Sequence, residues 1–192
     1  TLEFAHNVKR YGLAANQIEI DDKWERHYGD FTFDPAKFHD PKAMVDEIHK
    51  IGYKVTLWVY PFVNPDSPVY ANATQYFVKD ASTGKPAVAR WWNGNGAEVD
   101  FTNPKAADWF VGRLKALQAA TGIDSFKFDA GELGIGSYFR DAGMRIQFAD
   151  DEVNRHPNLF TDRYVATCAR FGGMIEVRSA YATTTNQSIF VR

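Results

Sequence analysis

A carboxylate and an ammonium lie two residues apart in the segment Phe126-Lys127-Phe128-Asp129. If this segment is a β-strand, Lys127 and Asp129 share one face and the two phenylalanines pack against helices on the other. A neighbouring ammonium favours the ionised form of a carboxylate, which is the form that a nucleophile needs. Asp129 is therefore a candidate nucleophile. The alternatives are a buried structural Lys–Asp pair and an Asp129 that caps the residues following it.

Aromatic side chains in two other segments could contact a sugar. Trp58 lies late in a β-rich run near residues 55–60, and Trp92 opens the turn-like sequence Trp92-Asn93-Gly94-Asn95-Gly96. An indole stacks its apolar face on sugar C–H groups and donates its ring N–H to a hydroxyl. Core packing is the alternative for both, although the turn favours a binding role for Trp92.

Charged side chains end further predicted strands. Asp21 and Asp22 end the first β-rich run, and Arg178 ends the last. A guanidinium can hold a carboxylate or several sugar hydroxyls through its fork of donors. Glu176 lies two residues earlier on the same face, so a structural ion pair with Glu176 is the alternative for Arg178.

A long polar stretch follows Asp129 directly. Residues 131–157 contain several glycines and are expected to form a loop over the site, because loops of this length are usually functional. Its acidic residues Asp141, Asp150 and Asp151 are expected to be solvated charges.

Helix-then-strand units must hold these side chains in place. Asp40-Pro41 and Asn103-Pro104 each join an N-capping residue to a proline suited to the first helical position. Gly52 and Gly122 follow apolar residues at helical spacing and predict where those helices end. Helices are predicted near residues 2–11, 41–51, 104–121 and 158–171, and strands near 18–22, 55–60, 97–101, 125–129 and 174–179.

Helix–strand units in series predict an α/β fold with a parallel sheet. An open doubly wound sheet would show a Gly-rich phosphate loop after its first strand, whereas Asp22-Lys23-Trp24-Glu25 contains no glycine. Polar residues at the strand ends instead favour a (β/α)8 TIM barrel, whose site lies at the C-terminal ends of its strands. About five of the eight strands can be found. Residues 1–192 are therefore predicted to be one partial barrel domain.

Composition argues against several classes of function. The chain has 22 basic and 24 acidic residues, so it offers no basic field to nucleic acid. The longest uncharged run in the middle of the chain, residues 55–65, is too short to span a membrane, and an anchor is expected only outside this chain. One cysteine, Cys168, and histidines without ligand spacing predict no disulfide, no metal site and no cofactor. The expected partner is a carbohydrate.

Five segments, in this order along nearly the whole chain, resemble motifs of glycoside hydrolase family 31. They are Ile18–Glu25, Leu57–Pro61, Val99–Pro104, Lys127–Glu132 and Val177–Ser179. The wording Asp129-Ala130-Gly131-Glu132 resembles the myogenesis-regulating glycosidase branch of the family more closely than its mainstream α-glucosidases.

The resemblance implies a retaining α-glycosidase with two catalytic carboxyl groups and a covalent glycosyl-enzyme intermediate. Asp129 matches the nucleophile of the family. Four further roles are matched residue by residue, namely substrate contact by Lys127, sugar orientation by Arg178, pocket lining by Trp58 and binding of distal hydroxyls by Asp21 or Asp22. The substrate is expected to be an α-galactoside or an α-glucoside, and the branch leans toward galactose.

The general acid/base of the family follows the arginine that Arg178 matches, but residues 179–192 contain no Asp or Glu. We therefore expect this residue beyond Arg192. We also expect the isolated chain to be inactive and poorly stable, because its sheet would stay open. A carbohydrate-binding protein without turnover is the rival hypothesis. A sugar-phosphate barrel enzyme is a third and less favoured one, since the chain has no clear phosphate-binding loop.

Two glycosylation sequons begin at Asn72 and Asn186. Sequons are used only in the secretory pathway, so they lean toward a secreted or membrane-associated protein.

Overall fold

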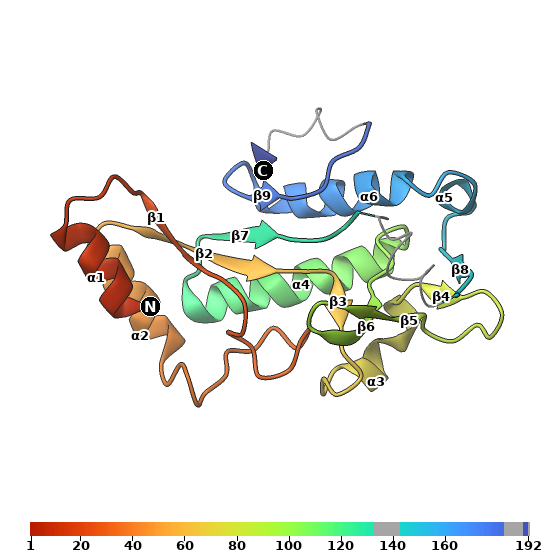
Figure 1. The fold of residues 1–192 in the computed structure, drawn as a ribbon, viewed down its shortest axis with the longest axis horizontal. Helices are drawn as coiled ribbons and strands as arrows, with labels where there is room; N and C mark the ends of the chain where they lie inside the picture. The colour runs from red at the N-terminus through yellow and green to blue at the C-terminus, as the bar shows by residue number, and fades with distance from the viewer. Residues whose placement is uncertain (133–142, 183–189, 192) are drawn as a thin grey trace.

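The computed structural model describes residues 1–132, 143–182 and 190–191. Its central feature is a parallel sheet in the order β1-β2-β7-β9-β10 (Figure 1). The strands are β1 (Gln17–Ile20), β2 (Lys54–Val59), β7 (Ser125–Phe128), β9 (Glu176–Val177) and β10 (Phe190–Val191). Each neighbouring pair is parallel, so the C-terminal ends of all five strands lie at one edge of the sheet.

Four longer helices flank this sheet. They are α1 (Leu2–Arg10), α2 (Pro41–Lys50), α4 (Pro104–Thr121) and α6 (Leu159–Cys168). Figure 1 shows α4 running along β2 and β7, α6 beside β9, and α1 with α2 at one end. Parallel strands that alternate with helices packed on one side are the wall of a TIM barrel, as predicted.

The predicted helix boundaries have clear local causes. The Asp40 carboxylate accepts a hydrogen bond from the Ala43 N–H at 2.8 Å, and the Asn103 amide oxygen accepts one from Lys105 N–H at 3.0 Å. Both contacts satisfy donors that the first turn of a helix leaves free. Gly122 ends α4 in the left-handed conformation, at φ 82°.

One predicted strand lies elsewhere. We expected residues 97–101 to be a barrel strand, but β6 (Gly94–Glu98) belongs to a separate antiparallel sheet in the order β3-β6-β5. Trp92 and Asn93 connect β5 (Val88–Trp91) to β6 in a tight hairpin, and Asn-Gly sequences favour such turns. The short-range pairing therefore takes this strand away from the barrel.

The remaining described elements are short. They are β3 (Phe62–Val63), α3 (Tyr70–Ala73), η1 (Thr74–Tyr76), β4 (Lys79–Asp80), β8 (Ile146–Gln147), α5 (Asp151–Arg155) and η2 (Ala169–Phe171). β4 pairs with β8 in an antiparallel ladder. The stretch 131–157, predicted as one long loop, thus contains a strand and a helix. Within the described residues, no helix is long and apolar enough to cross a membrane.

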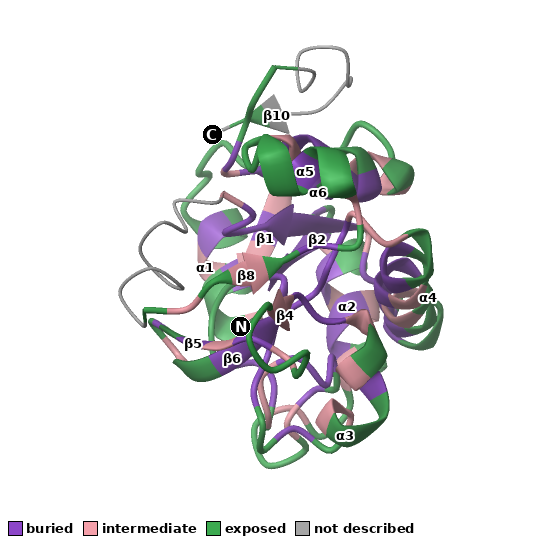
Figure 2. Cartoon of the chain, turned by 90° about the vertical axis from the view of Figure 1, so that its right-hand side faces the viewer, coloured by how far each residue is buried: buried purple, intermediate pink, exposed green. Residues whose placement is uncertain are grey.

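The outer face of the sheet is covered by aromatic side chains. Phe126 and Phe128 are fully buried, as their alternation predicted, and both rings contact Phe171 near the end of α6. Phe128 also contacts Phe110 of α4, with ring centroids 6.4 Å apart. Figure 2 shows β2 within the buried layer, while the helices turn exposed faces outward. The opposite face of β7 is thereby left for polar side chains.

Candidate active site

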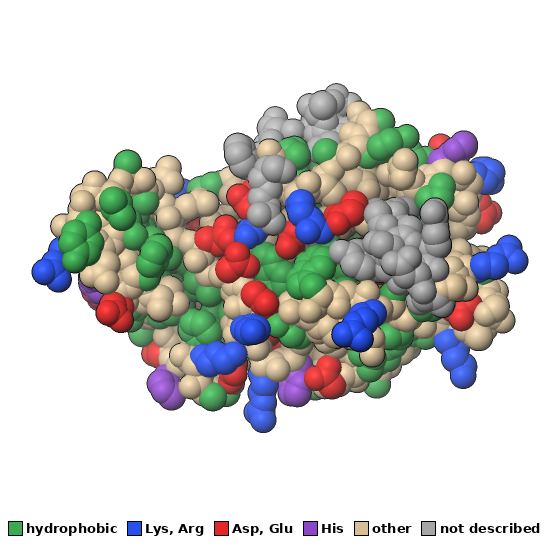
Figure 3. All heavy atoms as spheres, in the orientation of Figure 1, with side chains coloured by type: hydrophobic (Ala, Val, Ile, Leu, Met, Phe, Trp, Pro, Cys, Tyr) green, Lys and Arg blue, Asp and Glu red, His purple; other side chains and the backbone are tan. Residues whose placement is uncertain are grey.

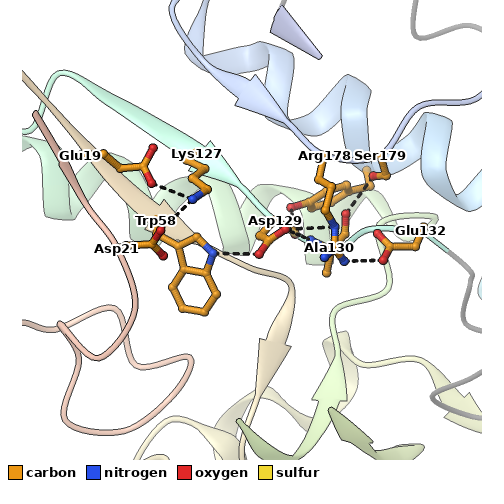
Figure 4. Close-up of polar contacts among 10 residues, drawn as sticks. Glu19, Asp21, Trp58, Lys127, Asp129, Ala130, Glu132, Arg178 and Ser179 are labelled. Atoms are coloured by element: carbon orange, nitrogen blue, oxygen red, sulfur yellow. Dashed lines mark hydrogen bonds and ion pairs between the residues drawn. The ribbon is translucent and has the colours of Figure 1, made fainter. Parts of the chain in front are cut away.

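The predicted nucleophile lies at the C-terminal end of β7. Asp129 directly follows the strand, and its N–H donates to the Val59 carbonyl oxygen at the end of β2, at 2.8 Å. The Asp129 side chain is oriented by two donors from neighbouring strands (Figure 4). Arg178 places Nε 3.1 Å from Oδ1, and Trp58 donates its indole N–H to Oδ2 at 3.0 Å. Both carboxylate oxygens are therefore held in a fixed plane.

Arg178 links several parts of the site. It follows β9 and forms a second ion pair with Glu132, just beyond Asp129. Its guanidinium also lies over the ring of Trp92, 5.2 Å from the centroid. Trp92 is 44% exposed, so it offers an indole face next to the two carboxylates. The structure thus brings together Arg178 and Trp92 from segments far apart in the chain.

The two predicted tryptophans differ in exposure. Trp58 is 2% exposed and its ring packs on Tyr60, with centroids 4.5 Å apart. Trp58 therefore reaches the site through its N–H on Asp129, whereas Trp92 is 44% exposed and lies under the Arg178 guanidinium. Sequence reasoning gave both residues the same stacking role, because burial cannot be read from a single aromatic position.

Lys127 occupies a different place from the one predicted. Its ammonium donates to Glu19 at 2.7 Å and to Asp21 at 2.8 Å, both on the β1 side of the site. The cation that pairs with Asp129 is Arg178 instead. The reason is geometric, since Lys127 and Asp129 share a face but the long lysine side chain extends across β2 toward β1 (Figure 4).

The pKa values of Lys127 and its partner Asp21 are both shifted. Burial disfavours the charge on Lys127, but the hydrogen bonds to Asp21 and Glu19 outweigh it and raise the pKa of the ammonium. Burial works against the Asp21 charge too, yet the Lys127 bond and a backbone N–H lower the pKa of Asp21. Lys127 and Asp21 therefore form a stable ion pair at neutral pH.

Asp21 and Asp22, which the sequence could not separate, have different surroundings. Asp21 is tied to Lys127, whereas Asp22 accepts hydrogen bonds from Tyr28 Oη at 2.8 Å and from Asn93 Nδ2 at 3.2 Å. Asp22 is exposed and lies close to the hairpin that carries Trp92. Of the two, Asp22 is the carboxylate flanked by uncharged hydrogen-bonding groups.

A buried network supports the segment that carries Asp22 and Tyr28. Glu25 accepts hydrogen bonds from the backbone N–H groups of Gly29 at 3.0 Å and Phe31 at 2.8 Å, and also from Tyr60 Oη. Burial raises the pKa of Glu25 to about 8, although these hydrogen bonds oppose the shift. Sequence reasoning missed this residue because its partners are not at a recognisable spacing.

Three acidic residues of the predicted loop 131–157 were expected to be solvated charges, and the structure describes two of them. Asp150 caps α5 by accepting from the Glu152 N–H at 2.8 Å and pairs with Arg163 at 3.4 Å, so it is not a free solvated charge. Asp151 is exposed, as expected, and Asp141 lies outside the described residues. No cluster of His, Cys, Asp and Glu suited to a metal ion occurs in the described part of the chain.

Four residues of the site were not predicted as site residues, namely Glu19, Tyr28, Asn93 and Glu132. Glu19 and Glu132 lie within the segments that resemble family motifs, and Asn93 lies in the predicted turn. Figure 3 shows acidic and basic side chains surrounding an apolar area near the middle of one face. Mixed charges beside exposed aromatic surface suit a polar ligand with apolar faces, and a sugar is such a ligand.

Comparisons with known proteins show which family the chain resembles in sequence and in fold. A family model described as "Glycosyl hydrolases family 31 TIM-barrel domain" matches residues 1–190. The mouse myogenesis-regulating glycosidase is 38% identical over 194 aligned residues, which cover 100% of this chain. An α-xylosidase from Lactiplantibacillus pentosus is 32% identical over 135 residues, or 68% of the chain.

Solved structures show the same fold. A family 31 dextranase from Flavobacterium johnsoniae in complex with glucose superposes with a TM-score of 0.83 over 98% of the chain, at 22% identity. An α-xylosidase from a soil metagenome in complex with xylose also gives 0.83, over 99% of the chain at 22% identity. The chain spans 26% of the mouse relative and 24% of the dextranase chain, about a quarter of each.

Proposed function

The chain belongs to glycoside hydrolase family 31, and from this we propose that the intact protein is a retaining α-glycosidase with Asp129 as its nucleophile. The Asp129 carboxylate attacks the anomeric carbon of a terminal α-linked sugar as the bond to the leaving oxygen breaks. A second carboxyl group protonates that oxygen and later takes a proton from the water that releases the sugar. Two inversions at one carbon retain its configuration.

The observation that carries the proposal is the setting of the Asp129 carboxylate. It lies at the C-terminal end of a barrel strand, where sites of this fold are found. Arg178 and Trp58 fix its two oxygens at 3.1 and 3.0 Å, and the exposed Trp92 ring lies beside Arg178. A nucleophile needs this kind of restraint, because attack requires aligned orbitals at close range.

The second carboxyl group is proposed to lie outside residues 1–192. Retaining enzymes hold their two carboxyl groups roughly 5–5.5 Å apart. In the family motif order this group follows the arginine that Arg178 matches, and residues 179–192 contain neither Asp nor Glu. Residues 1–192 would then be a partial barrel domain that supplies the nucleophile and part of the sugar pocket.

The substrate is proposed to be an α-galactoside or an α-glucoside. Relatives of the chain include lysosomal α-glucosidases and α-xylosidases, while its segment 129–132 resembles a branch that leans toward galactose. Asp22, with Tyr28 and Asn93 beside it, would bind distal hydroxyls, and Trp92 would stack on the ring. Lys127 and Asp21 would contact the sugar from the β1 side.

Labelling with activated fluoro-sugars tests the nucleophile. The full-length protein is incubated with activated fluoro-galactosyl and fluoro-glucosyl reagents, and the labelled peptide is identified by mass spectrometry. We expect the label on the peptide that contains Asp129, with faster labelling by the preferred sugar. Asp129→Asn should abolish labelling, whereas Asp108→Asn, a surface change on α4, should leave it unaltered.

Two outcomes would contradict the proposal. Label on a peptide without Asp129 would refute the nucleophile assignment. Sugar binding to the wild-type protein without labelling or turnover of an aryl α-glycoside would favour the rival function, a carbohydrate-binding protein that uses Trp58, Asp22 and Arg178 without catalysis.

A further inference from the structure

We propose that three buried hydroxyl groups, those of Thr161, Tyr164 and Ser179, position the nucleophile by fixing the backbone of residues 129–131. This inference rests on the proposed function, since it treats Asp129 as the nucleophile. We call residues 129–131 the nucleophile turn, and the three hydroxyl residues the hydroxyl clamp. Each clamp hydroxyl donates to a backbone carbonyl oxygen of the turn, so the three are positioning residues.

The nucleophile turn has an unusual backbone. Ala130 has φ 58° and Gly131 has φ 79°, so two successive residues adopt the left-handed region. A non-glycine residue in this region is strained and persists only when its surroundings hold it there. The Ala130 N–H also donates to Asp129 Oδ1 at 3.0 Å, so the turn conformation directly fixes one oxygen of the carboxylate.

Sheet hydrogen bonding ends where the turn begins. The Phe128 carbonyl oxygen still accepts from the Arg178 N–H at 3.2 Å, as in a parallel ladder. The next three carbonyl oxygens accept from side-chain hydroxyls instead. The bonds run from Tyr164 to Asp129 O at 2.8 Å, from Ser179 to Ala130 O at 2.9 Å and from Thr161 to Gly131 O at 3.0 Å.

These hydroxyls come from two elements that are far from the turn in sequence. Thr161 and Tyr164 lie one helical turn apart on α6, so they project from the same face of that helix. Ser179 follows Arg178 after β9, and Figure 4 shows it beside Ala130. All three side chains are at most 6% exposed, so water does not compete for the carbonyl oxygens.

The clamp therefore acts on the direction of the carboxylate. Its loss would free the turn to rotate toward ordinary dihedral angles, which would move the Ala130 N–H and with it Asp129 Oδ1. Burial raises the pKa of Tyr164 well above its usual range, so its hydroxyl remains a donor across the working pH range of the protein. Misplacement of a reacting group by about 1 Å can cost 100-fold in rate.

Paired substitutions in the full-length protein test this inference. Thr161→Val removes a hydroxyl without changing size, and Thr161→Ser keeps it. We expect Thr161→Val, Tyr164→Phe and Ser179→Ala each to lower kcat and the rate of fluoro-sugar labelling about 10- to 100-fold, with little change in KM. Thr161→Ser should retain the wild-type rate.

Thr167→Val is the matched control on α6. Thr167 is also 6% exposed, but its hydroxyl donates to the Arg163 carbonyl oxygen within the helix at 2.9 Å. Thr167→Val should therefore leave the labelling rate unaltered, while it lowers the melting temperature as much as Thr161→Val does. If Tyr164→Phe fails to fold, Thr161→Val and Ser179→Ala still test whether the clamp positions the nucleophile.

Two results overturn the inference in distinguishable ways. Equal labelling rates in Thr161→Val, Thr161→Ser and Ser179→Ala, with the label on Asp129, would refute the clamp and leave the proposed function standing. Absence of label on Asp129 in the wild-type protein would refute both.

Discussion

Arg178 contacts three chemical groups that come from two distant segments of the chain. Its Nε lies 3.1 Å from Asp129 Oδ1, its terminal nitrogen pairs with Glu132, and its guanidinium covers the Trp92 ring. A planar guanidinium can make these contacts together, whereas an ammonium is a single point of charge. We predict that Arg178→Lys in the full-length protein lowers kcat/KM for an aryl α-glycoside by about 100-fold.

Arg170→Lys provides the control for this prediction. Arg170 pairs with Asp108 at 2.9 Å on the surface, where exchange of one cation for another should have little effect. Steady-state kinetics of both variants are the measurement. A wild-type kcat/KM in Arg178→Lys would contradict the bridging role.

Glu25 should make the stability of the protein depend on pH. Burial raises the pKa of Glu25 from 4.5 to about 8, so the folded protein keeps a proton that the unfolded chain releases. Stability from this residue is therefore complete below pH 4.5 and is lost as the pH rises toward about 8. We predict a melting temperature that falls across this window, with a shallower fall in Glu25→Gln, measured by calorimetry on the full-length protein.

Glu3→Gln is the control for the pH measurement. Glu3 is exposed on α1, so its substitution should shift the curve of melting temperature against pH without changing its slope. Equal slopes in the wild-type protein and Glu25→Gln would show that Glu25 titrates in the same range folded and unfolded.

At the scale of the elements, the fit between the nucleophile turn and α6 is tight. A Cβ atom on Gly131 would overlap the Tyr164 ring, and the φ of 79° disfavours any side chain. We predict that Gly131→Ala destabilises the full-length protein by about 2–4 kcal/mol, the sum of overpacking and backbone strain. Denaturant unfolding measures the free energy of unfolding.

Gly143→Ala separates these two causes. Gly143 has a similar φ of 67°, but a Cβ there would meet no atom of the described residues within 4 Å. Its substitution should cost about 1 kcal/mol, from backbone strain alone. Equal losses at both positions would contradict steric overlap with Tyr164.

The elements with strong local signals were predictable from the sequence. The caps at Asp40 and Asn103 and the alternation of Phe126 and Phe128 predicted α2, α4 and β7, because each signal acts within a few residues. β6 was assigned to the wrong sheet, since periodicity identifies a strand but not its partner. The two-residue β10 offered no pattern at all.

The site was predictable only in part, for a related reason. Asp129 and Arg178 were singled out from residue type and strand position, and Trp92 from its place in a turn, and the structure brings the three together. The predicted partner of Lys127, Asp129, was wrong. Lys127 contacts Glu19 instead, which lies 108 residues away on another strand. Contacts at such separations depend on tertiary packing, which a single sequence does not reveal.

At the scale of the whole molecule, the sheet is open on both sides within the described residues. β1 and β10 each pair with a single neighbour there, and Phe4 and Leu13 are 62% and 60% exposed at the β1 side. We predict that residues 1–192 expressed alone are inactive and unfold without a cooperative transition, because open parallel edges leave part of the core unprotected.

Circular dichroism during heating and an aryl α-glycoside assay measure both parts of this prediction. The full-length protein, which should unfold cooperatively, is the control. A sharp thermal transition of residues 1–192 would contradict the stability claim, and turnover at the rate of the intact protein would contradict the claim that the acid/base lies elsewhere.

Under the proposed function, the hairpin β5–β6 and the barrel sheet would have separate roles. The hairpin would contact the sugar, and the barrel sheet would hold the group that reacts with it. Trp92 and Asn93 lie at its tip, in a small sheet whose hydrogen bonds are separate from the barrel sheet that holds Asp129 and Arg178. The tip can therefore diverge by mutation, or be grafted from a relative, without changing the hydrogen bonds of the barrel sheet. Under the proposed function, we expect preference for one sugar over another to evolve on this hairpin while the barrel keeps the same reaction.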